Sequence, residues 1–143
     1  MNVDGALFPN GCMSIGVVLR DNKGCILISQ AIHSTAIGDI QSIEALAILT
    51  GLELAKSYNL RILCIESDAQ TLVKAINSQE TCFFLCCNLD NDIRLLMSTF
   101  EACNLNFIRR DENHLAHSIA NSKSNWLGGL SSSLFDVATL DIT

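Results

Sequence analysis

The stretch that decides the fold is LRILCIESD, residues 60–68. Its first six positions are almost continuously apolar, which predicts a strand over 60–65 that is buried on both faces of a sheet. Residues 41–58, just before it, are rich in good helix formers and apolar around most of the helix circumference. Because a β run over 25–33 precedes this long helix, the order strand, helix, strand predicts a right-handed crossover and a parallel pair.

The chain before the long helix has the pattern of an antiparallel meander. Short, largely apolar runs cover residues 3–7, 12–19 and 25–33. A Phe-Pro-Asn-Gly turn signal separates the first two runs, and a loop ending in Gly24 separates the second and third. Three such runs with tight connections predict three strands that pair in sequence order.

The chain after residue 68 predicts three more helices and one more strand. Apolar residues recur at helical spacing over 69–78, 88–103 and 113–122, and a short apolar run covers 105–108. The prediction is an α/β fold with a five-stranded mixed sheet, the element order β-β-β-α-β-α-α-β-α, and helices on both faces.

Composition and charge limit the domain organisation and the classes of function. The 143 residues are one domain's worth, and we assign residues 1–123 to that domain and residues 124–143 to a C-terminal tail. Hydrophobic residues make up 49% and charged residues 17%, which excludes a disordered chain. Polar residues interrupt every apolar run before about 18 positions, so no membrane span is expected. The net charge of −6 excludes a strongly basic nucleic-acid binder but allows an acidic metal site.

The seven cysteines indicate a reducing compartment. Several lie inside apolar runs, where a cysteine is usually a small buried hydrophobe with a free thiol. The first residues have neither the positive region nor the apolar region of a secretory signal. We therefore expect an intracellular, monomeric protein of the nucleus or cytoplasm that is not secreted and keeps its thiols reduced.

Three acidic residues occupy unusual places in this pattern. Asp4 lies within the first strand, Glu44 lies in the first turns of the most hydrophobic helix, and Asp68 ends the most hydrophobic strand. Ligand sites of α/β sheets gather at the carboxyl ends of parallel strands. Converging carboxylates repel one another, and a hard divalent cation such as Mg²⁺ relieves that repulsion. The alternative for each acid taken alone is a helix cap or a solvated strand end.

Several short motifs follow one another in a characteristic order. They are Asn2-Val3-Asp4-Gly5-Ala6, residues 16–21 before a Gly turn, Glu44-Ala45, Glu66-Ser67-Asp68 and residues 109–120. In this order and spacing they resemble the type 1 RNase H domain, in the reverse-transcriptase-like variety found in plants. The resemblance spans residues 2–122 and implies an RNase H-like fold.

The resemblance implies hydrolysis of the RNA strand of an RNA–DNA hybrid. Two Mg²⁺ ions, or Mn²⁺ in their place, would hold the attacking water and the leaving oxygen in line. By motif position the catalytic residues and metal ligands would be Asp4, Glu44, Asp68 and His117, and Asn113 matches a position just ahead of the last ligand. The partner would be an RNA–DNA hybrid or another nucleic acid, recognised through backbone shape and 2′-hydroxyls.

The sequence departs from the family pattern in three places. His117 stands where the family has a fourth acid, and a neutral imidazole adds no charge and prefers softer ions than Mg²⁺. Only Lys74 and Arg94 are basic between the third acid and the last predicted strand, so the basic helical handle of some relatives is missing. The loop before the last helix carries Arg109-Arg110 where the family has a histidine.

These departures leave two other functions open. One is a catalytically weak nucleic-acid-binding module of the same fold, derived from a retroelement. The other is a protein-interaction domain with a decayed site, although the intact trio Asp4, Glu44 and Asp68 argues against decay. His33, at the end of an edge-like strand, is expected to be solvated.

Overall fold

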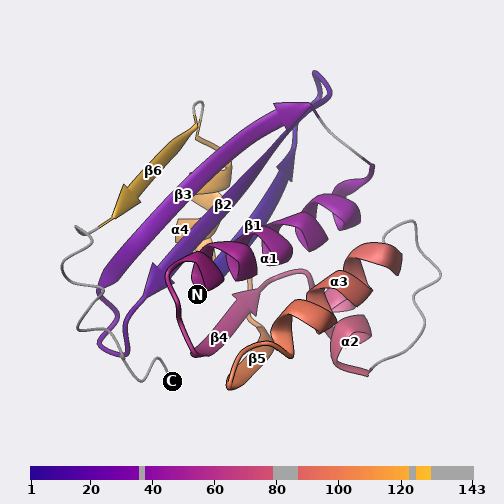
Figure 1. Cartoon of the computed structure of the whole chain (residues 1–143). Helices are drawn as coiled ribbons and strands as arrows, with labels where there is room; N and C mark the ends of the chain where they lie inside the picture. The colour runs from indigo at the N-terminus through magenta and orange to yellow at the C-terminus, as the bar shows by residue number, and fades with distance from the viewer. Residues whose placement is uncertain (36–37, 79–86, 123–124, 130–143) are drawn as a thin grey trace.

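The computed structural model describes residues 1–35, 38–78, 87–122 and 125–129 (Figure 1). These residues form one mixed sheet of six strands together with four helices. The element order predicted from the sequence is present and is followed by a further strand. In chain order the elements are β1 (Asn2–Leu7), β2 (Cys12–Arg20), β3 (Ile26–Thr35), α1 (Ile40–Ser57), β4 (Ile62–Ser67), α2 (Gln70–Ser78), α3 (Cys87–Met97), β5 (Ala102–Phe107), α4 (His114–Ala120) and β6 (Trp126–Gly129).

The sheet is antiparallel on one side of β1 and parallel on the other (Figure 1). Its strand order is β5-β4-β1-β2-β3-β6. The predicted meander is formed by the antiparallel pairs β1–β2 and β2–β3. β4 pairs with β1 in parallel, with Asn2 opposite Glu66, and β5 pairs with β4 in parallel. β1 is therefore a central strand on which both halves of the sheet meet.

The prediction of five strands is wrong, because a sixth strand forms within the segment assigned to the tail. β6 pairs antiparallel with β3, from Ala31 opposite Trp126 to Ile28 opposite Gly129. The outer edge of β3 offers unpaired backbone groups, and backbone pairing requires no particular side chains. A strand of four residues that ends in two glycines has no alternating pattern by which it could be recognised.

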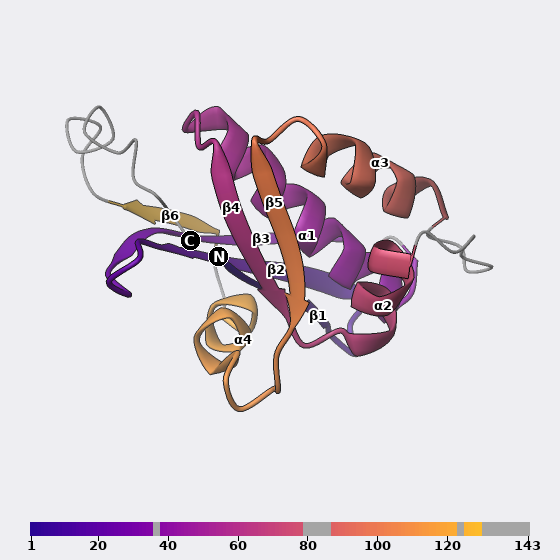
Figure 2. The same cartoon turned by 90° about the horizontal axis from the view of Figure 1, so that it is seen from below.

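The helices cover the two faces of the sheet unequally (Figure 2). α1, α2 and α3 lie over the larger core, which includes Val3 and Ile48. α4 alone lies on the other face, where it packs against β1, β2 and β3, and Ala116 joins Val18 in a smaller core. Helices on both faces were predicted, and the small size of α4 leaves part of its face uncovered.

The prediction that the strand over residues 60–65 is buried on both faces is wrong, because the helices cover only one face of β4. The strand alternates between half-buried and buried residues, from half-buried Ile62 to buried Ser67. One face packs on the larger core, and the other lies beyond the strands that α4 covers. The nearly continuous apolar run therefore does not reflect burial on both faces.

Local hydrogen bonds set the ends of two helices. Asp39 caps α1, because its carboxylate accepts a hydrogen bond from the Ser42 amide at 2.9 Å. α3 ends at Met97, earlier than predicted, where the hydroxyls of Ser98 and Thr99 donate to carbonyls of the preceding turn. The residues that follow are then available to form β5.

Helix length and thiol state bear on the remaining predictions. None of the described helices is both long enough and apolar enough to cross a membrane. Cys12, Cys25, Cys64 and Cys103 carry free thiols, as predicted. Cys82, Cys86 and the side chain of Cys87 lie outside the described part of the chain.

Candidate metal centre

Three carboxylates from three different elements meet at the end of the parallel strands. Asp4 lies in β1, Glu44 in the second turn of α1, and Asp68 directly after β4. One oxygen of each lies within 4.8 Å of one oxygen of each of the others. Asp4 is only 1% exposed, and Glu44 and Asp68 are half-buried. The predicted trio is thus brought together, with one face open to solvent.

A glycine brings α1 close enough for Glu44 to reach Asp4. An ideal Cβ on Gly5 would lie 2.9 Å from Ile43 Cγ2 and 3.1 Å from the Glu44 backbone nitrogen. A side chain at this position would force Ile43 or the backbone of α1 to shift, so glycine favours this close spacing of β1 and α1. The Gly5 amide then donates a hydrogen bond to Glu44 Oε2 at 3.2 Å.

Without a cation, the ionised forms of these carboxylates are energetically unfavourable. Burial, followed by the charges of Asp4 and Asp68, raises the pKa of Glu44 from 4.5 to about 8. Burial also raises the pKa of Asp4, and the hydrogen bond from His117 opposes that rise. Both shifts have the sign expected for acids that are out of water and close to like charges.

The side chain of Asn113 links β1 to the carboxylate that follows β4. It is 1% exposed, and its Nδ2 donates to Val3 O at 2.9 Å and to Asp68 Oδ1 at 3.1 Å. Its Oδ1 accepts a hydrogen bond from Asn2 Nδ2 at 3.3 Å. A neutral amide therefore holds Asp68 against the strand that carries Asp4.

A second glycine brings α4 to the opposite side of Asp4. Gly16 of β2 lies directly opposite Asp4 in the register. An ideal Cβ on Gly16 would lie 2.6 Å from the Ala120 nitrogen and would overlap the Ala116 carbonyl oxygen. The close packing of α4 on β2 places His117 Nδ1 2.8 Å from Asp4 Oδ2.

The contacts of His117 indicate which ring nitrogen carries hydrogen. Nδ1 also lies 3.3 Å from Arg110 Nη2, but one nitrogen cannot donate to a carboxylate and accept from a guanidinium together. The shorter contact, to the buried Asp4, favours an Nδ1–H group that donates to the carboxylate. Nε2 then holds the ring's lone pair, 3.3 Å from Asn121 Nδ2.

Arg110 supplies positive charge beside the carboxylates. Its Nη1 lies 4.0 Å from Asp68 Oδ2, and its side chain is 71% exposed. An exposed pair at this distance adds little to stability. The guanidinium instead places a solvent-accessible group that can bind phosphate at the rim of the site.

The donor set fits a hard divalent cation. Three carboxylates offer only oxygen ligands, and their mutual repulsion and raised pKa values are relieved by a positive charge between them. Among the described residues, the group whose ligand atoms all lie close to one another consists of the three acids and does not include His117. Glu66, two residues before Asp68, is also outside, and accepts a hydrogen bond from Asn2 Nδ2 at 3.0 Å.

The family of the chain is decided by a match over most of its length. Residues 2–123 match the family model described as reverse transcriptase-like. The chain belongs to the reverse transcriptase-like family. No curated protein sequence matches it significantly. The match covers the region whose motifs resemble this family, while the plant variety stays a prediction.

Solved structures of RNase H domains share the fold of this reverse transcriptase-like chain. RNase H1 from the halophilic archaeon Halobacterium salinarum has a TM-score of 0.78 and 21% identity, over 84% of this chain and 92% of its own. The N-terminal RNase H domain of a Mycobacterium tuberculosis protein, fused to maltose-binding protein, has a TM-score of 0.71 and 22% identity, over 83% and 87%. LC11-RNase H1, isolated from compost and solved with an RNA/DNA hybrid, has a TM-score of 0.74 and 18% identity, over 84% and 91%. These similarities establish the RNase H-like fold.

The structure places all four predicted site residues in one region, and sequence reasoning missed part of what surrounds them. Asp4, Glu44 and Asp68 form the acidic group, and His117 contacts it through Asp4. The link made by Asn113 through three hydrogen bonds was not foreseen, although its motif position was noted. The approach of Arg110 was also missed, and its only signal was a pair of arginines in an acidic chain.

Proposed function

We propose that this chain is a metal-dependent nuclease that hydrolyses the RNA strand of an RNA–DNA hybrid by a two-metal mechanism. The observation that carries the proposal is the approach of Asp4, Glu44 and Asp68 to within 4.8 Å of one another at the ends of the parallel strands. The family and the RNase H-like fold support it. The hybrid as substrate is supported by the complex of LC11-RNase H1 with an RNA/DNA hybrid.

Asp4, Glu44 and Asp68 would hold the cations. Mg²⁺ is the proposed ion, because it favours carboxylate oxygens and keeps bound waters, and Mn²⁺ is a substitute. Bound as a pair, such ions activate the attacking water and stabilise the leaving oxygen. The contribution of the chain is to hold three carboxylates at fixed positions, through the close approach at Gly5 and the hydrogen bonds of Asn113.

Arg110 is proposed to bind a backbone phosphate next to the cleavage point. Its guanidinium lies beside Asp68 and is largely exposed, so it is accessible to a strand that covers the carboxylates. Arginine stays protonated at neutral pH and donates hydrogen bonds in a fork that matches phosphate. It therefore positions the strand and cannot deliver a proton to the leaving oxygen.

His117 is proposed as the fourth ligand, and its present contact also fits a positioning role. To act as a ligand through Nδ1, the atom beside Asp4, the ring would have to carry its hydrogen on Nε2 instead, because a nitrogen bonded to hydrogen has no free lone pair. As a positioning residue it keeps the 2.8 Å hydrogen bond that orients Asp4. The dependence of cleavage on metal and pH separates these two roles.

The second candidate function is a catalytically weak nucleic-acid-binding module, derived from a retroelement. The observation in its favour is the engagement of His117 Nδ1 with Asp4 instead of a fourth carboxylate in the acidic group. The net charge of −6 also favours modest, salt-sensitive affinity for nucleic acid. On this alternative the chain binds hybrids but does not cleave them.

Cleavage of an end-labelled RNA–DNA hybrid in Mg²⁺, with Mn²⁺ in parallel, tests the proposal. Products should come from the RNA strand only, and a DNA duplex of the same sequence should stay intact. Asp4→Asn, which removes the central carboxylate, should abolish cleavage. Binding without cleavage by the wild type in both metals supports the second candidate, and absence of both binding and cleavage contradicts the two together.

A further inference from the structure

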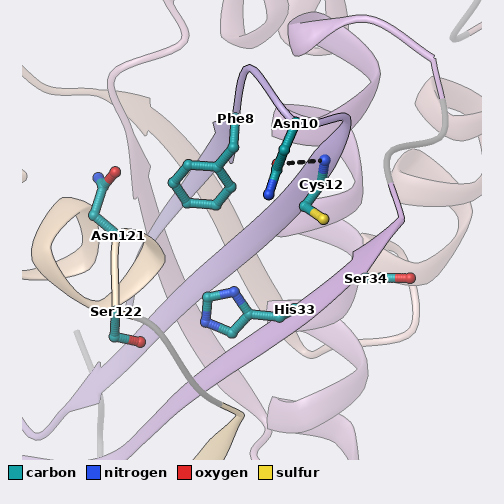
Figure 3. Close-up of a pocket in the computed structure, with 7 residues that line it drawn as sticks. All are labelled: Phe8, Asn10, Cys12, His33, Ser34, Asn121 and Ser122. Atoms are coloured by element: carbon teal, nitrogen blue, oxygen red, sulfur yellow. Dashed lines mark hydrogen bonds between the residues drawn. The ribbon is translucent and has the colours of Figure 1, made fainter.

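A cleft of about 530 Å³ opens on the same face of the sheet as α4 (Figure 3). It lies between the β1–β2 turn, the outer end of β3 and the end of α4. Its lining includes two aromatic side chains and several small polar ones. These are Phe8, Asn10, Cys12, His33, Ser34, Asn121 and Ser122. Among the described residues that line it none is acidic, although the chain as a whole carries a net charge of −6.

Two aromatic rings form the apolar part of the cleft. The planes of Phe8 and His33 lie within 15° of each other, and their centroids are 6.5 Å apart. Figure 3 shows both rings turned the same way, side by side, within the cleft. His33 was expected to be solvated, but it is half-buried against Phe8, and its Nε2 lies 3.5 Å from Ser14 Oγ. Two nearly parallel rings present an aromatic surface against which a third planar ring can stack.

Amide side chains border this aromatic surface. Asn10 Oδ1 accepts a hydrogen bond from the Cys12 amide at 3.0 Å, which leaves the Asn10 NH₂ group facing the cleft (Figure 3). Asn121 Nδ2 donates to the His117 carbonyl at 2.8 Å and lies 3.3 Å from His117 Nε2. An apolar platform with amide groups at its edge suits a heteroaromatic ring that carries donors and acceptors.

The cleft is linked to the candidate metal centre by β1 and by side-chain contacts of α4. Asp4, Ala6 and Phe8 alternate along the same side of β1 and its continuation. Four residues of a strand span about 13 Å, or about four base-pair steps of a duplex at ~3.4 Å each. Asn121 contacts His117, and His117 contacts Asp4. A strand with a phosphate at the carboxylates therefore passes the rings within a few nucleotides.

We propose that the Phe8–His33 cleft is a stacking site for an unpaired base of the strand that is bound at the carboxylates. This inference rests on the proposed function and specifies its substrate: a hybrid whose RNA strand has an unpaired stretch next to the paired region. A base inside a duplex is covered by its neighbours on both sides, whereas an unpaired base has a free face to place on aromatic rings. Stacking accepts every base, so the site selects structure and not sequence.

Binding by three fluorescein-labelled probes tests this proposal: a blunt RNA–DNA hybrid, the same hybrid with an unpaired RNA extension, and the single-stranded RNA. Anisotropy is measured in Ca²⁺, whose larger and looser coordination shell differs from the octahedral shell of Mg²⁺. The wild type should bind the extended hybrid roughly 5- to 150-fold more tightly than the blunt one, the range for one stacked base. Cleavage of both hybrids in Mg²⁺ is recorded alongside.

Variants at Phe8 separate stacking from packing. Phe8→Leu keeps an apolar side chain but removes the ring, so the preference for the extended hybrid should disappear, while Phe8→Tyr should keep it. His33→Leu, a second variant, should weaken the same preference, and Leu95→Ala, at an exposed site on α3, should leave it unchanged. Thermal unfolding of each variant establishes that it is folded.

The outcomes distinguish this inference from the proposed function. An unchanged preference in folded Phe8→Leu and His33→Leu overturns the stacking site while leaving hybrid cleavage intact. Phe8-dependent binding of single-stranded RNA without cleavage of either hybrid supports the stacking site and contradicts the nuclease. Equal binding of blunt and extended hybrids by the wild type overturns the inference directly, and so does a failure to bind any of the three probes.

Discussion

The two sides of the candidate metal centre are built in different ways. The acid side, made of Asp4, Glu44 and Asp68, is packed between the central strand and α1, and its exposure ranges from buried to half-buried. The helix side, made of Arg110, His117 and Asn121, consists of more exposed side chains, with His117 38% and Arg110 71% exposed. Close backbone packing, at Gly5 and at Gly16, positions both sides, but the side chains of the helix side are the more accessible to solvent.

This difference determines where charge can be concentrated. On the acid side the close contact of β1 with α1 at Gly5 keeps the backbones that carry Asp4 and Glu44 near each other. Burial, and after it the charges of Asp4 and Asp68, therefore raises the pKa of Glu44 to about 8. On the helix side a substituted side chain can extend into solvent with little disturbance of its neighbours. Substitutions should have large effects on the acid side and graded effects on the helix side.

The largest effect is expected from Asp68→Asn on the acid side. The oxygen of the introduced amide can still accept from Asn113, so the local structure is retained, but one of three charges is lost. RNA cleavage should fall by about a thousandfold or more, the scale of losing a principal electrostatic group. The stability of the metal-free protein should rise, because less repulsion remains.

Glu66→Gln is the matched control for this change. Glu66 lies two residues away on the same strand and outside the acidic group. Cleavage by this variant should stay near the wild-type rate. Unchanged cleavage in Asp68→Asn would contradict the assignment of Asp68, and a loss of similar size in both variants would point to damage at the strand end.

Glu44→Gln should change how stability depends on pH. A carboxyl with a raised pKa binds its proton more tightly when folded, so it stabilises the metal-free protein at low pH and this stability is lost as pH rises from about 4.5 to about 8. Above that window Glu44→Gln should be more stable than the wild type by about 2–4 kcal/mol, allowing for partial solvent screening. Urea unfolding at pH 5 and pH 9 in EDTA measures the difference.

The exposed Glu53 on the same helix supplies the control for Glu44. Glu53→Gln makes the same chemical change on the same helix but outside the acidic group, so it should not reproduce the pH-dependent gain in stability expected for Glu44→Gln. If the unfolding free energies of the wild type and Glu44→Gln depend on pH in the same way, the pKa of Glu44 is not raised in the folded protein. Added Mg²⁺ should stabilise the wild type more than Glu44→Gln.

Asn113→Ala should reduce stability by a smaller amount. The substitution removes the donor to Val3 O and Asp68 and the acceptor for Asn2, in a position that is 1% exposed. Buried groups left without partners cost about 1–3 kcal/mol. Asn104→Ala, at an exposed position of β5, should change stability by less than about 0.5 kcal/mol. Equal unfolding midpoints for the two variants would contradict the link between β1 and Asp68.

The sequence predicted the fold well where hydrophobic patterns decide it. The buried run at 60–65 and the long apolar helix before it required a mixed sheet with a parallel pair. β6 was missed because its pairing with β3 depends on backbone groups, which leave no side-chain pattern. The end of α3 was misplaced because Ser98 and Thr99 stop the helix by local hydrogen bonds within an otherwise helical pattern.

The candidate site was predictable only in part. Asp4, Glu44 and Asp68 are notable because acids are rare on such apolar elements, and the motif order then groups them. No local pattern indicates that Gly5 and Gly16 set the spacing of two helices around Asp4, because the contacting residues lie far away in the sequence. The pairing of Phe8 with His33 is equally non-local, since all of β2 and most of β3 separate the two residues along the chain.

The smallest effect is expected on the helix side, from His117→Asp. If His117 is a ligand, a carboxylate at this position adds charge to the acidic group, and half-maximal cleavage should need about three- to tenfold less Mg²⁺, equivalent to ~1 kcal/mol. Mn²⁺ accepts imidazole more readily than Mg²⁺, so the ratio of Mn²⁺ to Mg²⁺ activity should be higher in the wild type than in the variant. Imidazolium cannot coordinate a metal, so the acid limb of the pH profile of cleavage should be flatter in the variant than in the wild type.

The alternative, in which His117 positions Asp4, predicts a different set of curves. The introduced carboxylate would repel Asp4 where the imidazole now donates a hydrogen bond at 2.8 Å. Cleavage should then fall at every pH, and the Mg²⁺ requirement should not decrease. His114→Asp, an exposed change one turn earlier on α4, controls for added negative charge alone. Identical dependence of cleavage on metal and pH for His117→Asp and the wild type would exclude both roles. The three carboxylates of the acid side would then hold the metal without a contribution from the helix side.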